Sequence, residues 1–461
     1  MKKKLLSLIF IFLLTFIPRL YKINNPVADW HSWRQADTAA VARNFIKDRF
    51  NLLYPQADSF VPNNDLGLTN PDRLFLNEFP FYNALVALLY KTFGINPAIA
   101  RLVSVSFAGL GAVFLYLLTT RLFGPVIGLT AGLFYALNPY NIYYGRVIMP
   151  DPIFVSLSII SLYLFVNFKF ILFSFVFALA VLVKPYAIFI LLPCFYWAVV
   201  FKKTKQFFFC LLSLLPLALW RLHISLVPEG SFSSRWLYNE TNIRFTGAFF
   251  RWLIFDRLNR LIFATGGFVL FIIGILNSSL NKTRGLIFVW LLSVMLYMTI
   301  FAMGNVTHDY YQLPIMPVGS ILVAFGFWAI INASKKLFPR LINWLLALVL
   351  VILSLAFGWY EVRGFFNINH PEIITAGEAV DRLLPKDALV IAPYNRDVAF
   401  LYQTNRHGWP EGGNLAAKIS QGATHYVSVD LNNPETQALA STCSVLEKTS
   451  AYIIINLKSC L

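Results

Sequence analysis

Long apolar segments alternate with short polar ones from the start of the chain to about Tyr360. Apolar segments of about 15–22 residues suit membrane-spanning helices, and basic residues gather in every second connection, as the positive-inside rule expects of cytoplasmic loops. The pattern predicts an α-helical polytopic membrane protein with about eleven spanning helices, its N-terminus cytoplasmic and its C-terminus extracytoplasmic. The expected helices cover approximately residues 5–21, 98–119, 126–144, 152–168, 171–183, 186–201, 206–222, 264–280, 285–303, 313–332 and 341–359.

One apolar segment leaves the number of spans open. Phe79–Phe93 is apolar enough to cross a bilayer, but it is only about 15 residues long. The alternation of basic loops is kept if it lies along the outer interface, within a long first outer loop at about residues 22–97. We favour that interpretation. If the segment spans instead, the number of spans rises to about twelve or thirteen.

The pattern changes after Tyr360. The runs DALVIAPY, ATHYVSVDL and YIIINL are short and of β type, and helical patterns occupy Pro371–Leu384 and Asn414–Ile419. We therefore expect a transmembrane domain over residues 1–360 and a small extracytoplasmic α/β domain over residues 361–461. Cys443 and Cys460 are the only cysteines in this second part, and an oxidising compartment favours a disulfide between them.

Composition supports a membrane protein and changes the interpretation of the charge. Of the 461 residues, 58% are hydrophobic and only 13% are charged, against about a quarter charged in soluble proteins. The net charge of +16 does not indicate nucleic acid, because much of it lies in the short cytoplasmic loops. Several arginines fall in expected outer loops, where an anionic ligand is the natural explanation. The basic start and apolar run form an uncleaved first helix in this interpretation, since no small-residue cleavage site follows.

The most polar stretch near the membrane is Ala28–Phe45, with the sequence ADWHSWRQADTAAVARNF. From Trp33 onward it has good helix formers and no Gly or Pro. Helical spacing places Arg34, Asp37 and Val41 on one face, so polar groups can point into a site and Arg34 would favour the ionised form of Asp37. The alternative is an interfacial helix anchored by tryptophans.

Four polar clusters lie on one side of the membrane in this topology. Any single cluster is ordinarily a loop ion pair, but four on one side predict a shared site, since ionisable groups beside a bilayer are costly unless they are paired or hydrated. Their candidate site residues are Asp29, His31, Arg34 and Asp37; Arg73 and Glu78; Arg146 and Asp151; and His308, Asp309 and Tyr311.

Several site chemistries lack their motifs. The chain has no Walker loop, no dinucleotide-binding fingerprint and no HExxH pair, and no inner loop is long enough to form a catalytic domain. We expect no metal site, although a divalent metal at His308 and Asp309 is an alternative to ordinary hydrogen bonding. Tyr311 belongs to a doubled tyrosine that either anchors the chain at the interface or stacks on a sugar.

The chain resembles the C-fold membrane glycosyltransferases, in the branch shared by protein O-mannosyltransferases and the aminoarabinose transferase of lipid A. The resemblance covers about residues 1–330. It is carried by HSWRQADTAAVARNF in the first outer loop, FPFYNALVALLYKTFG, the RVIMPDP turn and the HDYYQLPIMP turn. It implies an inner-membrane enzyme that moves a sugar from a polyprenyl phosphate donor to an acceptor hydroxyl outside the cytoplasm, with inversion. The acceptor could be a lipid, a glycan or a protein.

The resemblance also suggests roles for the candidate residues. Glycosyl transfer needs a carboxylate to take the acceptor proton and cations to hold the departing phosphate. We favour Asp37 over Asp29 as the base, and Asp151 is either catalytic or simply a first residue of a helix. Two positions depart from relatives: Arg34-Gln35 replaces an Asp-Glu pair, and Glu78-Phe79-Pro80 replaces Lys-Pro-Pro. The expected phosphate ligands are therefore Arg73, Arg146 and Arg244, and the expected acceptor or other site residues are His31, Arg34, Glu78, His308, Asp309 and Tyr311.

Two other functions are compatible with a polytopic protein. A transporter or flippase of lipid-linked saccharides predicts inverted repeats and broken helices at mid-membrane, whereas the sequence shows no repeats. A non-catalytic receptor or assembly subunit would leave the outer polar clusters without a role.

Overall fold

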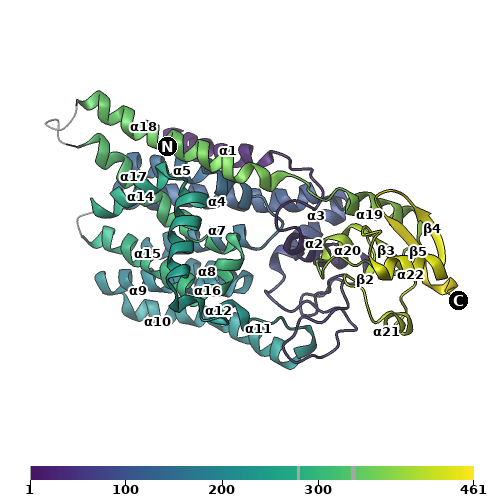
Figure 1. Ribbon diagram of the computed structural model, residues 1–461. Coiled ribbons are helices and arrows are strands. Elements are labelled where there is room, and N and C mark those ends of the chain that lie inside the picture. Colours follow the sequence, from purple (N-terminus) through teal and green to yellow (C-terminus); the bar gives the residue numbers. More distant parts are fainter. Residues whose placement is uncertain (1, 278–280, 334–338, 461) are drawn as a thin grey trace. The chain divides into compact units, whose positions relative to one another are not determined.

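The computed structural model describes residues 2–277, 281–333 and 339–460. The chain forms two compact units (Figure 1). The first, here called the helical unit, comprises Met1–Ile23, Arg101–Arg221 and Ser234–Phe365. The second, called the mixed unit, comprises Asn24–Ala100, Leu222–Ser233 and Phe366–Leu461.

The helical unit is built from apolar helices that run side by side. Glycines allow α14 (Gly266–Leu276) and α17 (Ile315–Ile331) to approach closely. A Cβ on Gly274 would lie 1.9 Å from the carbonyl oxygen of Leu322, and one on Gly326 would lie 1.9 Å from the carbonyl oxygen of Leu270. Its helices are α1 (Lys2–Phe16), η1 (Ile17–Leu20), α4 (Pro97–Phe123), α5 (Pro125–Leu137), α6 (Pro139–Tyr144), α7 (Asp151–Val166), α8 (Phe170–Val183), η2 (Pro185–Ile190), α9 (Leu191–Val200), α10 (Thr204–Cys210), η3 (Leu211–Leu214), α11 (Leu215–Leu226), α12 (Trp236–Asn239), η5 (Ile243–Phe245), α13 (Gly247–Arg251), the π-helix η6 (Trp252–Phe263), α14 (Gly266–Leu276), α15 (Lys282–Ile300), α16 (Ala302–Thr307), η7 (Asp309–Gln312), α17 (Ile315–Ile331), α18 (Arg340–Val362) and η8 (Arg363–Phe366).

In the part of the chain that the structure describes, each segment predicted to span the membrane coincides with one or more apolar helices; residues 278–280, at the end of the segment expected at 264–280, lie outside that part. Within the described residues, four helices are long and apolar enough to cross a bilayer by themselves: Pro97–Phe123, Thr204–Leu226, Lys282–Ile300 and Arg340–Phe366. A fifth span results if Gly247–Phe263 and Gly266–Leu276, which are bent by 112°, are counted as one. The other apolar helices are shorter. The number of about eleven spans and the orientation therefore stay predictions.

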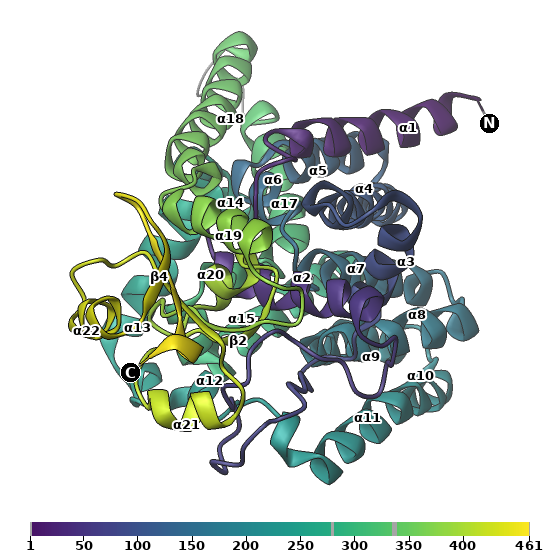
Figure 2. The same cartoon turned by 90° about the vertical axis from the view of Figure 1, so that its right-hand side faces the viewer.

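The mixed unit contains a five-stranded sheet with the order β2-β1-β3-β5-β4. Figure 2 labels two of these strands, β2 and β4. Strand β1 pairs in parallel with β2 and β3, whereas β5 pairs antiparallel with β3 and β4. The unit's elements are α2 (Ser32–Lys47), α3 (Phe81–Phe93), η4 (Pro228–Gly230), α19 (Glu372–Leu383), β1 (Leu389–Ile391), α20 (Val398–Gln403), β2 (His407–Trp409), α21 (Leu415–Ser420), β3 (His425–Ser428), α22 (Pro434–Thr442), β4 (Ser444–Lys448), β5 (Ile453–Asn456) and η9 (Leu457–Ser459).

Part of the expected first outer loop packs on this sheet. The backbone N–H of Phe60 donates to the carbonyl of Gly408, and the N–H of Gly408 donates to the carbonyl of Asp58, each over 3.0 Å. Val61 joins a buried apolar cluster with Ile391 and Trp409. The contacts thus group the outer-loop residues with the C-terminal ones, which differs from the division between residues 360 and 361 expected from the sequence.

Helix α3 contains the apolar segment whose placement the sequence left open. It packs on α2, with Tyr82, Val86 and Tyr90 buried and Leu88 and Phe93 exposed. Its 13 residues correspond to about 20 Å, less than the roughly 30 Å of a bilayer's hydrocarbon core. A short helix with one buried and one exposed side suits an interfacial location. That α3 lies at the membrane surface stays a prediction.

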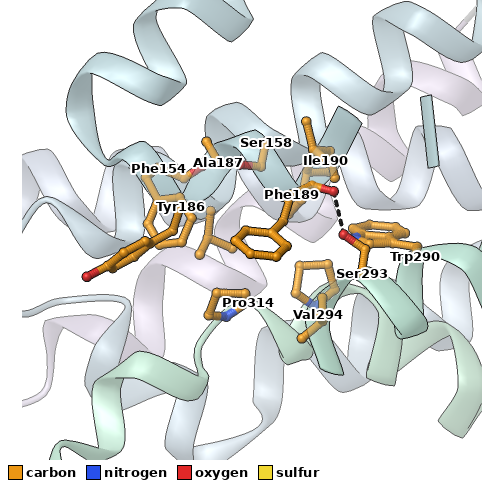
Figure 3. A pocket seen from close by; sticks show the side chains of 13 residues that line it. Phe154, Ser158, Tyr186, Ala187, Phe189, Ile190, Trp290, Ser293, Val294 and Pro314 are labelled. Atoms are coloured by element: carbon orange, nitrogen blue, oxygen red, sulfur yellow. Dashed lines mark hydrogen bonds between the residues drawn. The ribbon is translucent and has the colours of Figure 1, made fainter. Parts of the chain in front are cut away.

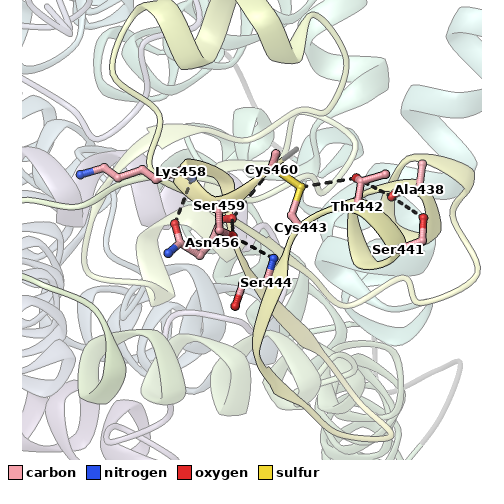
Figure 4. Close-up of a disulfide and its surroundings, with 9 residues drawn as sticks. All are labelled: Ala438, Ser441, Thr442, Cys443, Ser444, Asn456, Lys458, Ser459 and Cys460. Atoms are coloured by element: carbon pink, nitrogen blue, oxygen red, sulfur yellow. Dashed lines mark hydrogen bonds between the residues drawn. A yellow bond between two sulfur atoms is a disulfide. The ribbon is translucent and has the colours of Figure 1, made fainter.

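The predicted disulfide is present. Cys443 and Cys460, 17 residues apart, are joined by a disulfide (Figure 4). Next to it, the N–H of Ser444 donates to the hydroxyl of Ser459 over 2.8 Å. The bridge therefore ties the start of β4 to the end of the described chain.

Candidate active site

Helix α2 places a nearly buried carboxylate in a pocket of the mixed unit. Asp37 is 8% exposed, and it lines a pocket of about 330 Å³. Throughout the part of the chain that the structure describes, no hydrogen bond or ion pair engages this carboxylate. The pocket is lined by Trp33, Asp37, Ser59, Val61, Asn63, Phe232, Asn395, Arg396, Asp397, Val398 and Pro410.

The residues around Asp37 shift the pKa of its carboxyl group. Burial raises this pKa most, the nearby negative charges of Asp58 and Asp397 also raise it, and the resulting value is about 7. Arg34 lowers the pKa, as expected, but by less than burial raises it. Arg34 therefore favours the ionised form of Asp37, as expected, but burial outweighs this effect and the group titrates near neutrality.

Asp29 has a different environment. It is buried, and its Oδ1 accepts a 2.6 Å hydrogen bond from Nε2 of Gln35, which also donates to the carbonyl of Trp30 over 3.0 Å. His31 precedes helix α2 in a left-handed conformation, with φ 56°. Asp29 is thus held in the turn before the helix, while Asp37 faces the pocket.

An ion pair connects the first two predicted clusters. Nη2 of Arg34 donates to both carboxylate oxygens of Glu78, over 2.9 and 2.8 Å. Arg73 forms a second group: its Nη1 lies 2.7 Å from the carbonyl of Ala57 and 2.8 Å from Nδ1 of His407, and its Nη2 lies 3.2 Å from Asp48. These contacts hold Arg73 against strand β2.

The buried carboxylate Asp58 was not singled out from the sequence. Burial by itself would raise its pKa, but Arg43, His407 and Asn44 lower it to about 2. Arg43 forms an ion pair with Asp58 and also donates to the carbonyl of Tyr402 over 3.0 Å. Helix α2 is thereby fixed to helix α20, which begins directly after Asp397 of the pocket wall.

The helical unit contains its own buried polar group. Lys184 donates to both carboxylate oxygens of Asp151, over 2.7 and 2.8 Å. Its Nζ lies 5.5 Å from the ring centre of Tyr310 and 5.4 Å from that of Tyr311. Asp151 begins α7 without capping it, because no side-chain hydrogen bond caps this helix. The ion pair, and not a helix cap, is the observed partner of Asp151.

Asp309 lies in the same unit and contacts an arginine. Its carbonyl accepts a 2.6 Å hydrogen bond from the hydroxyl of Tyr140, and its carboxylate accepts one from Tyr144. Nη1 of Arg257 is 4.0 Å from the Asp309 carboxylate, and Nη2 donates to the carbonyl of Val306 over 2.9 Å. Arg257 belongs to the π-helix η6, a rare element that is frequent at functional sites.

The remaining candidates of the helical unit contact aromatic rings or backbone carbonyls. The His308 ring stacks on Tyr310 and Tyr311, with centroids 5.4 and 5.9 Å away. Arg146 is fully buried and donates to the carbonyls of Tyr21 and Lys22 over 3.0 and 2.7 Å. Arg244 donates to the carbonyl of Ile300 over 2.5 Å. In the described ranges, no group of three or more His, Cys, Asp or Glu side chains is placed to hold a metal ion.

A small apolar pocket of the helical unit is lined in part by residues that follow Lys184 in the sequence. Tyr186, whose ring centre is 5.8 Å from the ammonium of Lys184, is one of its walls. Figure 3 shows the rings of Tyr186 and Phe189 beside Pro314, and the hydroxyl of Ser293 next to Phe189. Its volume of about 40 Å³ is far below the roughly 300–1,000 Å³ of small-molecule sites. It therefore gives no argument for a bound ligand.

Comparison with known proteins identifies the fold. Residues 77–225 match the family described as dolichyl-phosphate-mannose-protein mannosyltransferase. The structure of ArnT from Cupriavidus metallidurans bound to undecaprenyl phosphate is similar at a TM-score of 0.65 and 12% identity, over 98% of this chain and 97% of that one. An Archaeoglobus fulgidus oligosaccharyltransferase complex with zinc and sulfate is similar at 0.60 and 12%, over 94% and 69%. The chain has the C fold of membrane glycosyltransferases. The resemblance predicted from the sequence is confirmed.

No curated protein sequence matches the chain significantly. The family match covers residues 77–225, and the structural likeness shows the fold. The ArnT structure contains a polyprenyl phosphate, undecaprenyl phosphate, in a protein of the same fold.

Sequence reasoning assigned no role to Lys184, Arg257 or Asp397. Lys184 lies between two apolar segments, and a lysine inside an apolar region is itself a signal. Arg257 and Asp397 carried no comparable signal, because each lies in a polar segment where charged residues are ordinary.

Proposed function

We propose that this chain is an integral inner-membrane glycosyltransferase that moves a sugar from a polyprenyl-phosphate-linked donor to an acceptor hydroxyl on the extracytoplasmic side. The C fold and the family match over residues 77–225 support the enzyme class. In this proposal the N-terminus is cytoplasmic and the mixed unit extracytoplasmic. Labelling cysteines introduced at positions 203 and 308 from each side of the membrane tests this orientation, since the two positions should face opposite sides.

The observation that carries the proposal is the state of Asp37. A general base works best when its pKa lies near the operating pH, and burial raises the pKa of Asp37 to about 7. The carboxylate faces a pocket, and no partner among the described residues occupies its oxygens. It is thus available to accept a proton, whereas Asp29 is hydrogen-bonded to Gln35.

The reaction then follows with balanced charges. Asp37 takes the proton of the acceptor hydroxyl, the hydroxyl oxygen forms a bond to the anomeric carbon, and the bond from that carbon to the phosphate oxygen breaks. The polyprenyl phosphate leaves with the negative charge. A single in-line displacement of this kind inverts the configuration at the anomeric carbon.

The departing phosphate needs a cation. Arg73, Arg146 and Arg244 remain the sequence-based candidates, but Arg146 is fully buried against two carbonyls and Arg73 is bonded to Asp48 and His407. Arg257 is a further candidate, because guanidinium matches phosphate oxygens and its carboxylate contacts, at 3.7 and 4.0 Å, are loose, while its Nη2 donates to the carbonyl of Val306. Lys184 is a second cation of the helical unit, already paired with Asp151.

Purified protein and a labelled polyprenyl-phosphate sugar test the function directly. We expect release of polyprenyl phosphate that depends on added membrane extract as the source of acceptor. In cells, deleting the gene should shift the mass spectrum of total envelope glycans by one sugar and cause the lipid-linked donor to accumulate. An unchanged spectrum and no donor consumption would contradict the proposal.

One observation favours transport of a lipid-linked saccharide instead. The helix pair Gly247–Phe263 and Gly266–Leu276 is bent by 112°, as broken helices of transporters are. Reconstitution in liposomes separates the two functions. Reorientation of a lipid-linked sugar between leaflets, without its consumption, would favour the transporter.

A further inference from the structure

The walls of the Asp37 pocket come from segments far apart in the sequence. Helix α2 provides Trp33 and Asp37, the expected first outer loop provides Ser59, Val61 and Asn63, and the residues before α20 provide Asn395, Arg396 and Asp397. All of them belong to the mixed unit. The volume of about 330 Å³ lies at the lower end of the roughly 300–1,000 Å³ range of small-molecule sites.

The pocket contains a second carboxylate, on Asp397. One of its oxygens accepts a 2.7 Å hydrogen bond from the backbone N–H of Ala399, which caps helix α20. Burial raises the pKa of this carboxyl above its usual value. Two carboxylates that line one pocket are costly without a ligand or solvent that donates hydrogen bonds to them.

The backbone next to Asp397 is strained. Asn395 and Arg396 have φ values of 51° and 64°. Asparagine tolerates this left-handed conformation, but arginine rarely adopts it, and such residues persist where the surrounding structure enforces them, often at functional sites. Asn395 and Arg396 form part of the pocket wall and position Asp397 in it.

The charge of the pocket favours a neutral ligand over an anionic one. Arg396 is the only cation among its lining residues, and its Nε already lies 2.9 Å from the carboxylate of Glu411. Asp37 and Asp397 therefore repel a phosphate or a carboxylate. A neutral ligand with several hydroxyl groups suits them, because each hydroxyl donates to a carboxylate or amide oxygen. The rings of Trp33 and Phe232 are the apolar surfaces on which a sugar ring stacks.

We propose that this pocket binds a neutral sugar unit of the acceptor, with Asp397 accepting hydrogen bonds from its hydroxyls and Trp33 stacking on its ring. The inference rests on the proposed function and deepens it: the acceptor is a glycan or glycolipid, and its hydroxyl is presented to Asp37. Asp397 is then a determinant of acceptor specificity.

Saturation-transfer NMR on the full-length protein in detergent tests this inference. The probes are neutral methyl glycosides of hexoses and N-acetylhexosamines, with glucose 1-phosphate as the anionic comparison and a serine- and threonine-containing peptide as the other acceptor class. The variants are Asp397→Asn, which keeps an oxygen to cap α20, and Trp33→Leu. Asp387→Asn is the matched control, since Asp387 is an exposed aspartate of the same unit outside the pocket.

At least one methyl glycoside should bind the wild type, and both pocket variants should weaken that binding at least tenfold while Asp387→Asn leaves it unchanged. Glucose 1-phosphate should bind at least tenfold more weakly. The inference is overturned if no glycoside binds, if all four proteins bind alike, or if the peptide is the probe whose binding Asp397→Asn removes.

Release of polyprenyl phosphate, measured on the same samples, separates the two levels of the argument. Donor consumption without glycoside binding would overturn only the sugar pocket. Glycoside binding that depends on Asp397, without any donor consumption, would overturn the proposed transferase function and leave the pocket in place.

Discussion

The ammonium group of Lys184 donates to both carboxylate oxygens of Asp151, at 2.7 and 2.8 Å, and the two side chains are only 5% and 3% exposed. The pair joins the end of α8 to the start of α7 in the helical unit. A buried charge that loses its partner costs more than an exposed one, because no solvent replaces the lost interaction.

Asp151→Asn should therefore destabilise the protein strongly. Leaving the Lys184 charge uncompensated is expected to cost about 3–5 kcal/mol. The double variant Asp151→Asn/Lys184→Met should recover most of this loss, as measured by unfolding midpoints in detergent. Lys386→Met, at an exposed ion pair, is the control and should cost less than about 1 kcal/mol. If the double variant is no more stable than Asp151→Asn, the buried charge is not the cause.

Removing the disulfide should destabilise the mixed unit. Cys443 and Cys460 close a loop with a separation of 17 residues, and replacing both with Ala is expected to cost about 3 kcal/mol on the chain-entropy model. The unfolding midpoint of the full-length variant should fall, while Ser441→Ala should leave it nearly unchanged. The bridge itself is checked by intact mass: alkylation of both thiols without prior reduction would show that it does not form.

Arg257→Ala should impair use of the lipid donor. A charge-assisted contact contributes about 1.5–3 kcal/mol, so the variant should lower donor turnover or raise the donor KM by about tenfold or more. Arg260→Ala is the matched control, because Arg260 lies on the same π-helix but is half exposed and pairs with Asp256 and Glu361. Arg146→Ala should mainly lower the unfolding midpoint. If Arg146→Ala changes the donor KM and Arg257→Ala does not, the sequence-based assignment is correct.

The apolar helices of this chain could be predicted because hydropathy is a local property. The segment expected from Trp33 onward is α2, at Ser32–Lys47, and the helix expected at 171–183 is α8, at Phe170–Val183. Strand β2 escaped notice because it is three residues long with a central glycine, and β4 because its side chains are largely exposed. Neither has the alternating pattern of a half-buried strand.

The candidate site could be predicted only in part. That Asp37 lies near Arg34 could be predicted, since the two residues are three positions apart on one face of the same helix. The pocket wall at Asn395–Val398 could not be predicted, because these residues lie some 360 positions from Asp37 and nothing in their local sequence indicates that they contact it. The raised pKa of Asp37 could not be predicted either, since it depends on burial by those distant residues.

The pKa of Asp37 predicts an unusual dependence of stability on pH. The folded-state pKa is about 7 against about 3.9 in the unfolded chain, so the wild type loses stability as pH rises from about 4 through 7, by roughly 4 kcal/mol in total. Asp37→Asn cannot ionise and should avoid this loss. Its stability advantage over the wild type should be small at pH 4 and largest above pH 8 in thermal unfolding. An advantage that does not change with pH would contradict the buried, ionising carboxyl.

The most direct test of Asp37 as the base compares sugar transfer by Asp37→Asn and Asp29→Asn. Asn keeps the shape of Asp and removes its basicity, so the comparison probes chemistry more than folding. The measurement is the rate of sugar transfer from a labelled polyprenyl-phosphate donor, with donor binding determined in parallel. Asp37→Asn should transfer at least about a hundredfold more slowly, with donor binding retained, while Asp29→Asn keeps most of its rate. Normal transfer by Asp37→Asn together with loss of transfer in Asp29→Asn would contradict this account and make Asp29 the catalytic carboxylate.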